Sequence, residues 1–109
     1  MTANNFWIMS IQMIVKNSNL IKKNLQLLVF GSVLTKSDPR DIDLLLVYNS
    51  QSFKISDVIN IRKKLRKILE KEIQKPIDIC ILSEDEAVTN PFIKEENAIK
   101  IFGDLCKTP

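Results

Sequence analysis

Three short apolar runs constrain the fold of this chain more than any other feature. They cover residues 25–30, 41–48 and 77–82, and turn-forming or polar residues such as Gly31, Asn49 and Pro76 bound them. Runs of this length, rich in aliphatic side chains and stopped by Gly or Pro, are typical of buried strands and too short for ordinary helices. The sequence therefore predicts a small sheet built on these three strands.

The connections between the runs predict how the strands pair. About 30 residues separate the second and third runs, enough for a β-α-β crossover between parallel strands. Only about ten residues join the first and second runs, which favours an antiparallel pair. The long connection has a helical period, and its apolar positions fall on one face. These positions are Val58, Ile61, Leu65, Ile68, Leu69 and Ile73.

The remaining segments predict a single α+β (α/β-like) domain over residues 1–109. Its mixed sheet has three or four strands, with helices packed mainly on one face. Further expected elements are a helix from Asn4 or Asn5 to about Lys16, a short helix opened by the capping-box spacing Ser83–Glu86, a helical turn from Pro91 to about Asn97, and a last strand at residues 99–102.

Composition excludes several kinds of site. The chain has no histidine, and its two cysteines, Cys80 and Cys106, lie far apart, so a zinc site and a His-based triad or general base are excluded. Cys80 lies in an apolar run and is predicted to be a small buried residue. The apolar segment 6–15 is too short to cross a bilayer and lacks the basic start of a secretory signal, so we expect a cytoplasmic protein.

Charge is concentrated in one element. The formal net charge is +3, but residues 57–75 contain seven basic and three acidic residues. This basic surface is compatible with RNA binding, although no aromatic residue lies between the Lys and Arg residues to stack on bases. We therefore interpret it as the solvated outer face of a crossover helix.

Three aspartates lie at the entries of two predicted strands. Asp41 and Asp43 are two residues apart and point to one face, and Asp78 has the equivalent position in the next parallel strand. Clustered carboxylates repel one another, and a hard divalent cation such as Mg²⁺ relieves that repulsion. Gly31 allows close approach of the backbone, and Ser32 can donate to a phosphate. These five residues predict a site for metal-assisted phosphoryl chemistry.

The same residues resemble a known family. Phe30-Gly31-Ser32, an eight-residue spacer, Asp41-Ile42-Asp43-Leu44 and a later Pro76-Ile77-Asp78-Ile79 resemble the polymerase β-like nucleotidyltransferase superfamily. The chain is most similar to the minimal nucleotidyltransferases (MNT) of prokaryotic toxin–antitoxin and defence modules. The resemblance covers about residues 25–102 and includes the N-P-F tail at residues 90–92.

The resemblance implies a reaction and roles for the site. Asp41 and Asp43 would bind one or two Mg²⁺ ions, and Asp78 would bind the catalytic ion and accept the proton of an acceptor hydroxyl. Gly31 and Ser32 would hold the triphosphate while NMP, most often AMP, moves from NTP to the hydroxyl. In minimal members the acceptor is often a tyrosine of a HEPN-type toxin encoded nearby, so the chain would act as an antitoxin.

The spacer before the paired aspartates departs from the family pattern. It lacks a second glycine and the usual arginine after Gly-Ser, and Arg40 stands where serine commonly precedes the first aspartate. Lys36 or Arg40 is predicted to supply the phosphate-binding cation instead.

Two other functions remain open at this level. One is nucleotide transfer to RNA or to a small molecule. The other is a degenerate module that masks a toxin by binding alone, through the apolar first helix. That helix also predicts a partner surface or a homo-oligomer contact at Trp7, Met9 or Met13.

Overall fold

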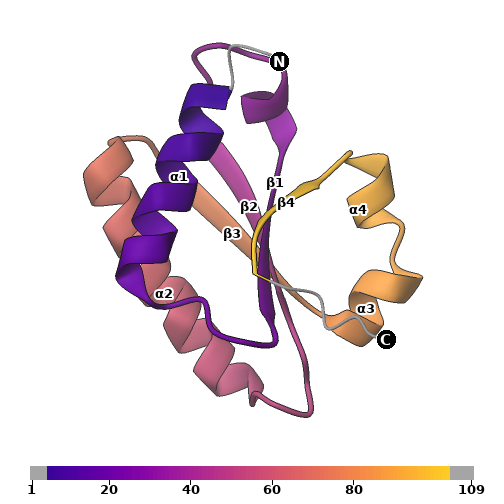
Figure 1. The fold of residues 1–109 in the computed structure, drawn as a ribbon. Helices are drawn as coiled ribbons and strands as arrows, with labels where there is room; N and C mark the ends of the chain where they lie inside the picture. Colours follow the sequence, from indigo (N-terminus) through magenta and orange to yellow (C-terminus); the bar gives the residue numbers. More distant parts are fainter. Residues whose placement is uncertain (1–4, 104–109) are drawn as a thin grey trace.

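The structure, a computed structural model, describes residues 5–103 of the chain (Figure 1). Its elements, in chain order, are α1 (Asn5–Ser18), β1 (Leu25–Phe30), a 3-10 turn η1 (Gly31–Leu34), β2 (Ile42–Tyr48), α2 (Ile55–Ile73), β3 (Ile77–Ser83), α3 (Glu84–Thr89), α4 (Phe92–Glu95) and β4 (Ile99–Phe102).

The four strands form one mixed sheet in the order β3-β2-β1-β4. Strands β2 and β3 are parallel, and β1 is antiparallel to both β2 and β4. The predicted α+β fold class and the predicted pairing of the three central runs are therefore confirmed. The expected fourth strand exists, and it lies at the edge beside β1.

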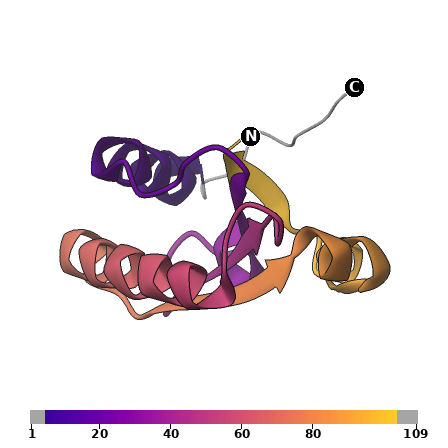
Figure 2. The same cartoon turned by 90° about the horizontal axis from the view of Figure 1, so that it is seen from below.

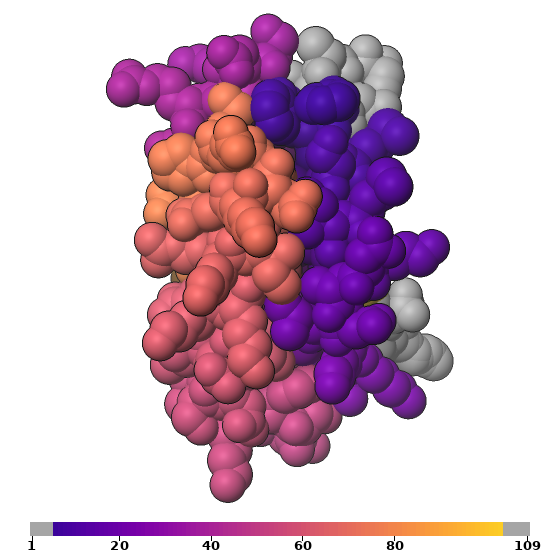
Figure 3. Space-filling model, turned by 90° about the vertical axis from the view of Figure 1, so that its left-hand side faces the viewer, coloured from indigo at the N-terminus to yellow at the C-terminus, as the bar shows by residue number. Residues whose placement is uncertain are grey.

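Helices α1 and α2 cover one face of the sheet, and α3 and α4 lie on the opposite side (Figure 2). The two long helices run side by side, and together they form one flank of the molecule (Figure 3). The main core lies between these helices and the sheet, and it includes Ile11, Val15, Leu27, Leu44, Leu46, Leu65, Leu69 and Ile77. A smaller cluster on the other face is formed by Leu28, Leu45 and Val47 with partly buried residues that include Phe30 and Phe92.

Local sequence signals account for the end of α2 and for the start of α3. Helix α2 ends where Gln74 takes a left-handed conformation (φ 62°), one residue before Lys75-Pro76, which cannot continue the helix. The predicted capping box is present, because the Ser83 hydroxyl accepts from the Glu86 amide while the Glu86 carboxylate accepts from the Ser83 amide. The proposed cap at Asn4 lies outside the described residues.

Side chains of α2 also protect the free edge of β3. The Ile77 amide donates to the Glu70 carboxylate at 3.1 Å, and the Arg62 guanidinium donates to the Ile79 carbonyl at 3.4 Å. Edge strands expose unpaired backbone groups, and these contacts satisfy two of them. The hydrogen bond from the Ile77 amide holds the pKa of Glu70 below its usual value, and Arg66 adds to this effect.

The prediction of a buried Cys80 is wrong. Its side chain is exposed, because it lies on the face of β3 opposite to the main core, where only the short helices α3 and α4 pack. The alternation of β3 decides this, since Ile79 before it is buried against α2. Cys106 lies outside the described residues.

None of the helices in residues 5–103 is both long enough and apolar enough to cross a membrane.

Candidate active site

Two carboxylates meet across the parallel strands. Asp43 of β2 is aligned with Asp78 of β3 in the strand register. Their neighbours Ile42, Leu44 and Ile77 are buried in the core under the two long helices, so both aspartates point to the opposite face. Asp78 is exposed and Asp43 is half-buried. The two chain segments that the sequence analysis paired thus present adjacent acidic side chains.

Gly31 lies directly against the Asp43 carboxylate. Strand β1 ends at Phe30, which is aligned with Asp43 across the antiparallel pair. The chain then turns at Gly31 with φ 81°, in the left-handed region that favours glycine. A Cβ added at this position would collide with the Asp43 Oδ2 and would lie 3.3 Å from its Cγ. Only glycine permits this contact between the turn and the carboxylate.

The acidic side chains around Asp43 act on it electrostatically. The pKa of Asp43 is raised above its usual value, first because burial disfavours the charged form. The carboxylates of Asp41, Asp78 and Glu96 then raise it further, in that order. The three predicted aspartates therefore belong to one electrostatic group, in which Asp43 is the central member.

Glu96 is a member that the sequence analysis did not identify. It follows α4, and its amide donates to the Phe92 carbonyl at 2.9 Å. Phe92 in turn packs edge-to-face on Phe30, with ring centroids 4.9 Å apart. Because Phe30 precedes Gly31, this contact anchors α4 beside the site. The only signal in the sequence was an acidic pair after the N-P-F tail, which is distant in the sequence from Asp43 and Asp78.

The predicted phosphate-binding residues lie in and after η1. The Ser32 carbonyl accepts from the Thr35 and Lys36 amides at 3.0 and 2.8 Å, which closes the turn. Lys36 and Arg40 are exposed in the loop that leads to β2. Neither side chain has an ion-pair partner among residues 5–103. The structure thus brings Gly31, Asp41, Asp43 and Asp78 together and leaves Lys36 and Arg40 at the surface.

The donor set fits a hard divalent cation in kind. Asp41, Asp43 and Asp78 supply carboxylate oxygens, the ligands that Mg²⁺ prefers, and their mutual repulsion is what a bound cation relieves. In the described part of the chain, however, no three acidic or cysteine side chains are grouped closely enough to form a ready metal site. Metal binding here would require the carboxylates to close on the ion.

Cys80 lies on the same face as Asp78, two residues farther along β3. Its pKa is raised above the usual value, first by desolvation and then by the charges of Asp43 and Asp78, while Arg62 opposes the shift. A raised pKa keeps the thiol protonated and weakly nucleophilic. Cys80 therefore lies beside the carboxylates on an exposed face, and its raised pKa favours the protonated thiol.

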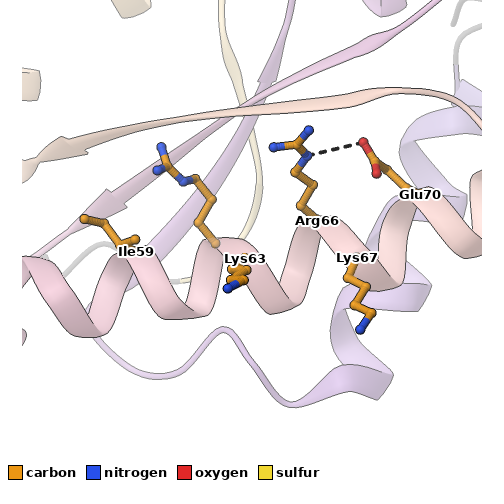
Figure 4. Close-up of a pocket in the computed structure, with 6 residues that line it drawn as sticks. Ile59, Lys63, Arg66, Lys67 and Glu70 are labelled. Atoms are coloured by element: carbon orange, nitrogen blue, oxygen red, sulfur yellow. Dashed lines mark hydrogen bonds and ion pairs between the residues drawn. The ribbon is translucent and has the colours of Figure 1, made fainter.

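A second feature, the basic groove, lies along α2. It has a volume of about 360 Å³ and is lined by Ile59, Arg62, Lys63, Arg66, Lys67 and Glu70 (Figure 4). Arg66 is directed toward Glu70 and forms an ion pair with it at 3.3 Å, whereas Lys67 extends on the other side of the helix. This groove contains neither Asp43 nor Asp78, so it is separate from the acidic site.

A comparison with known protein families gives a match over most of the chain. Residues 10–102 match the family model described as Polymerase beta, Nucleotidyltransferase. No curated protein matched the chain. The match spans the segments that carry Gly31, Asp43 and Asp78, and it extends over β4. The chain therefore belongs to the polymerase β nucleotidyltransferase family.

Proposed function

We propose that this nucleotidyltransferase domain moves NMP, with AMP the first choice, from an NTP to a hydroxyl acceptor and releases pyrophosphate. One observation carries the proposal: Asp43 and Asp78 are adjacent across parallel strands, with the Gly31 turn against Asp43. This arrangement places acidic oxygens next to a turn whose backbone can approach a phosphate chain.

Each residue has a role in this reaction. Asp41, Asp43 and Asp78 would hold one or two Mg²⁺ ions, and Asp78 would accept the proton of the attacking hydroxyl. When bound there, Mg²⁺ would supply charge neutralisation for the triphosphate. Gly31 and Ser32 would contact the triphosphate through the backbone and the Ser32 hydroxyl. Lys36 or Arg40, both exposed nearby, would pair with its charge.

For the acceptor, we propose a hydroxyl of a partner protein, in the first instance a HEPN-type toxin that the chain neutralises as an antitoxin. Two features support a protein acceptor. The sheet face that carries Asp78 and Cys80 is exposed at these two residues, so a partner side chain can reach it. In addition, α1 presents Phe6, Met9 and Met13 as exposed apolar residues, which suit a protein contact or a homo-oligomer.

An RNA acceptor is the second candidate, and the basic groove along α2 favours it. Arg62, Lys63 and Lys67 would pair with backbone phosphates there. The prediction for this alternative is that Lys63→Glu with Lys67→Glu lowers transfer to RNA but leaves transfer to a protein unchanged. A masking module without catalysis is the third candidate, and the carboxylate variants below separate it from both enzymes.

The experiment is a transfer assay with Mg²⁺ and ATP labelled at the α-phosphate, run with a cognate HEPN toxin, with bulk RNA and with neither. ATP labelled at the γ-phosphate serves as the parallel control, because only nucleotide transfer retains the α label. We expect the α label on one acceptor, none of the γ label, and loss of transfer in Asp43→Asn and in Asp78→Asn.

Asp57→Asn is the matched control, since Asp57 is an exposed aspartate at the start of α2, outside the acidic group. Its activity should equal that of the wild type. If neither label is transferred and wild type and Asp43→Asn neutralise the toxin equally, the masking module replaces the enzyme. Transfer of the γ label would show a kinase instead.

A further inference from the structure

The loop between η1 and β2 is held at several points by residues far away in the sequence. The Trp7 indole Nε1 donates to the Ser37 carbonyl at 2.9 Å. Lys75 Nζ donates to the Pro39 carbonyl at 2.7 Å and to the Asp38 carboxylate at 2.9 Å. This loop carries Lys36, Arg40 and Asp41. Two elements outside the sheet, α1 and the segment after α2, thus hold the chain that leads into the site.

The contacts that hold this loop contribute unequally to its stability. The Asp38 side chain is 85 % exposed, so its ion pair with Lys75 contributes little. The Lys75 side chain is only 17 % exposed, and its Nζ lies 4.9 Å from the centroid of the Trp7 ring. Pro39, whose carbonyl accepts from Lys75, is buried. The indole, the ammonium and the two loop carbonyls therefore form one unit, which we call the loop clamp.

The loop clamp connects the two halves of the acidic group. Lys75 stands three residues before Asp78, and Pro39 stands two residues before Asp41. Between them, the Ile42 amide donates to the Pro76 carbonyl at 3.0 Å. The same short contact region therefore sets how the entry to β2 lies relative to the entry to β3. A change in the clamp would move Asp41 and the exposed cations relative to Asp78.

We propose that Trp7 and Lys75 are positioning residues for nucleotide transfer. They hold the loop at residues 35–41 in the position from which Asp41 and Arg40 reach the acidic site. The inference rests on the proposed function for its catalytic consequence. Its physical part, that these two residues restrain the loop, is independent of any activity. Displacements of about 1 Å in a site can reduce rates by up to about a hundredfold, so such restraint matters.

The physical part is tested by native-state trypsin digestion, with the cleavage products followed by mass spectrometry. The loop contains cleavage sites after Lys36 and Arg40, and Lys75 is followed by proline, so a substitution at Lys75 removes no usable site. We expect Trp7→Phe, which loses the indole donor, and Lys75→Met, which loses the ammonium, each to raise the loop cleavage rate about tenfold. Cleavage after Lys67 in α2, followed in the same digest, should not change.

The catalytic part is tested with the same variants in the transfer assay. We expect kcat to fall about tenfold and the Mg²⁺ concentration at half-maximal rate to rise, because Asp41 is misplaced. Lys75→Arg keeps a cation over the Trp7 ring. It should restore most of kcat and bring the Mg²⁺ concentration at half-maximal rate close to the wild-type value. Lys71→Met, on the exposed surface of α2, is the matched control and should behave as the wild type.

Each outcome decides a separate question. Unchanged loop cleavage in both variants, or an equal rise after Lys67, overturns the loop clamp. Faster loop cleavage with unchanged kcat and Mg²⁺ dependence overturns the positioning role. If the wild type transfers no label, the proposed function fails, and the digestion still decides whether the clamp exists.

Discussion

The residues of one strand are buried to different extents on the two faces of the sheet. On the helix-covered face, Ile42, Leu44 and Leu46 of β2 are completely buried under α1 and α2. On the other face, Asp43 lies between them in sequence and is only half-buried, and Asp78 beside it is exposed. A single strand therefore supplies the stability of the fold with one set of residues and the chemistry of the site with the other.

The difference comes from the size of the helices on each side. Helices α3 and α4 are short, and they bury only part of the second face, fully at Leu28, Leu45 and Val47 and partly at Phe30. Near the strand entries this face stays open, so charged groups remain in contact with water there. Burial of unpaired carboxylates would be costly, and the partial cover avoids most of that cost. The comparison predicts that substitutions on the two faces will separate stability from activity.

The largest expected effect is on the covered face. Leu44→Ala should lower the free energy of unfolding by about 2–5 kcal/mol, because it leaves a cavity in the main core. Asp78→Asn, on the open face, should change it by less than about 0.5 kcal/mol while abolishing transfer. Urea unfolding measures both. Similar losses of stability in the two variants would show that the two faces do not separate stability from activity.

The next effect is expected where the two faces meet, at Gly31. Gly31→Ala should cost about 1–2 kcal/mol from the left-handed backbone alone, with a further cost from the collision with Asp43. It should also displace that carboxylate and abolish transfer. Ser32→Ala, in the adjacent position, is the stability control and should change the free energy of unfolding by less than about 0.5 kcal/mol. A Gly31→Ala protein as stable as the wild type would contradict the close contact.

A smaller effect concerns pH and stability on the open face. The raised pKa of Asp43 means that the folded state binds a proton more tightly than the unfolded state does. Its contribution to stability is therefore fully present below the ordinary aspartate pKa of 3.8 and is lost as pH rises through the raised value. Asp43→Asn should remove this loss, so the variant gains stability over the wild type as pH increases, measured without divalent cations. An equal difference at every pH would contradict the raised pKa.

The smallest expected effect is that of Glu96 on Asp43. Glu96→Gln should lower the pKa of Asp43 slightly, Asp78→Asn more, and Asp41→Asn most among these three, following the order of their charges. NMR titration of the Asp43 carboxyl carbon measures each shift. Glu95→Gln is the matched control, since Glu95 is exposed and absent from the groups that shift Asp43. An unchanged pKa in Glu96→Gln would remove Glu96 from the acidic group.

Much of the fold could be predicted because its signals are local. The two-residue alternation of strands and the 3.6-residue period of α2 depend on neighbouring side chains, and the Ser83–Glu86 capping box depends on four residues. Connection lengths then decided parallel against antiparallel pairing, which explains why Asp43 and Asp78 could be expected on one face. The boundaries shifted by only a residue or two, as with α1, which extends to Ser18.

The tertiary structure decided which distant residues meet. Cys80 became exposed because only short helices cover its face, and no local pattern states how far such a cover extends. Glu96 reaches Asp43 because Phe92 packs on Phe30, about 60 positions away in the chain. The contact of Trp7 with Ser37 likewise depends on how α1 lies across the sheet. The sequence by itself determined the elements and the chemistry of their side chains, since both are local properties. Packing between distant segments determined how much of the second sheet face is covered, whether the loop clamp forms and where Glu96 lies relative to Asp43.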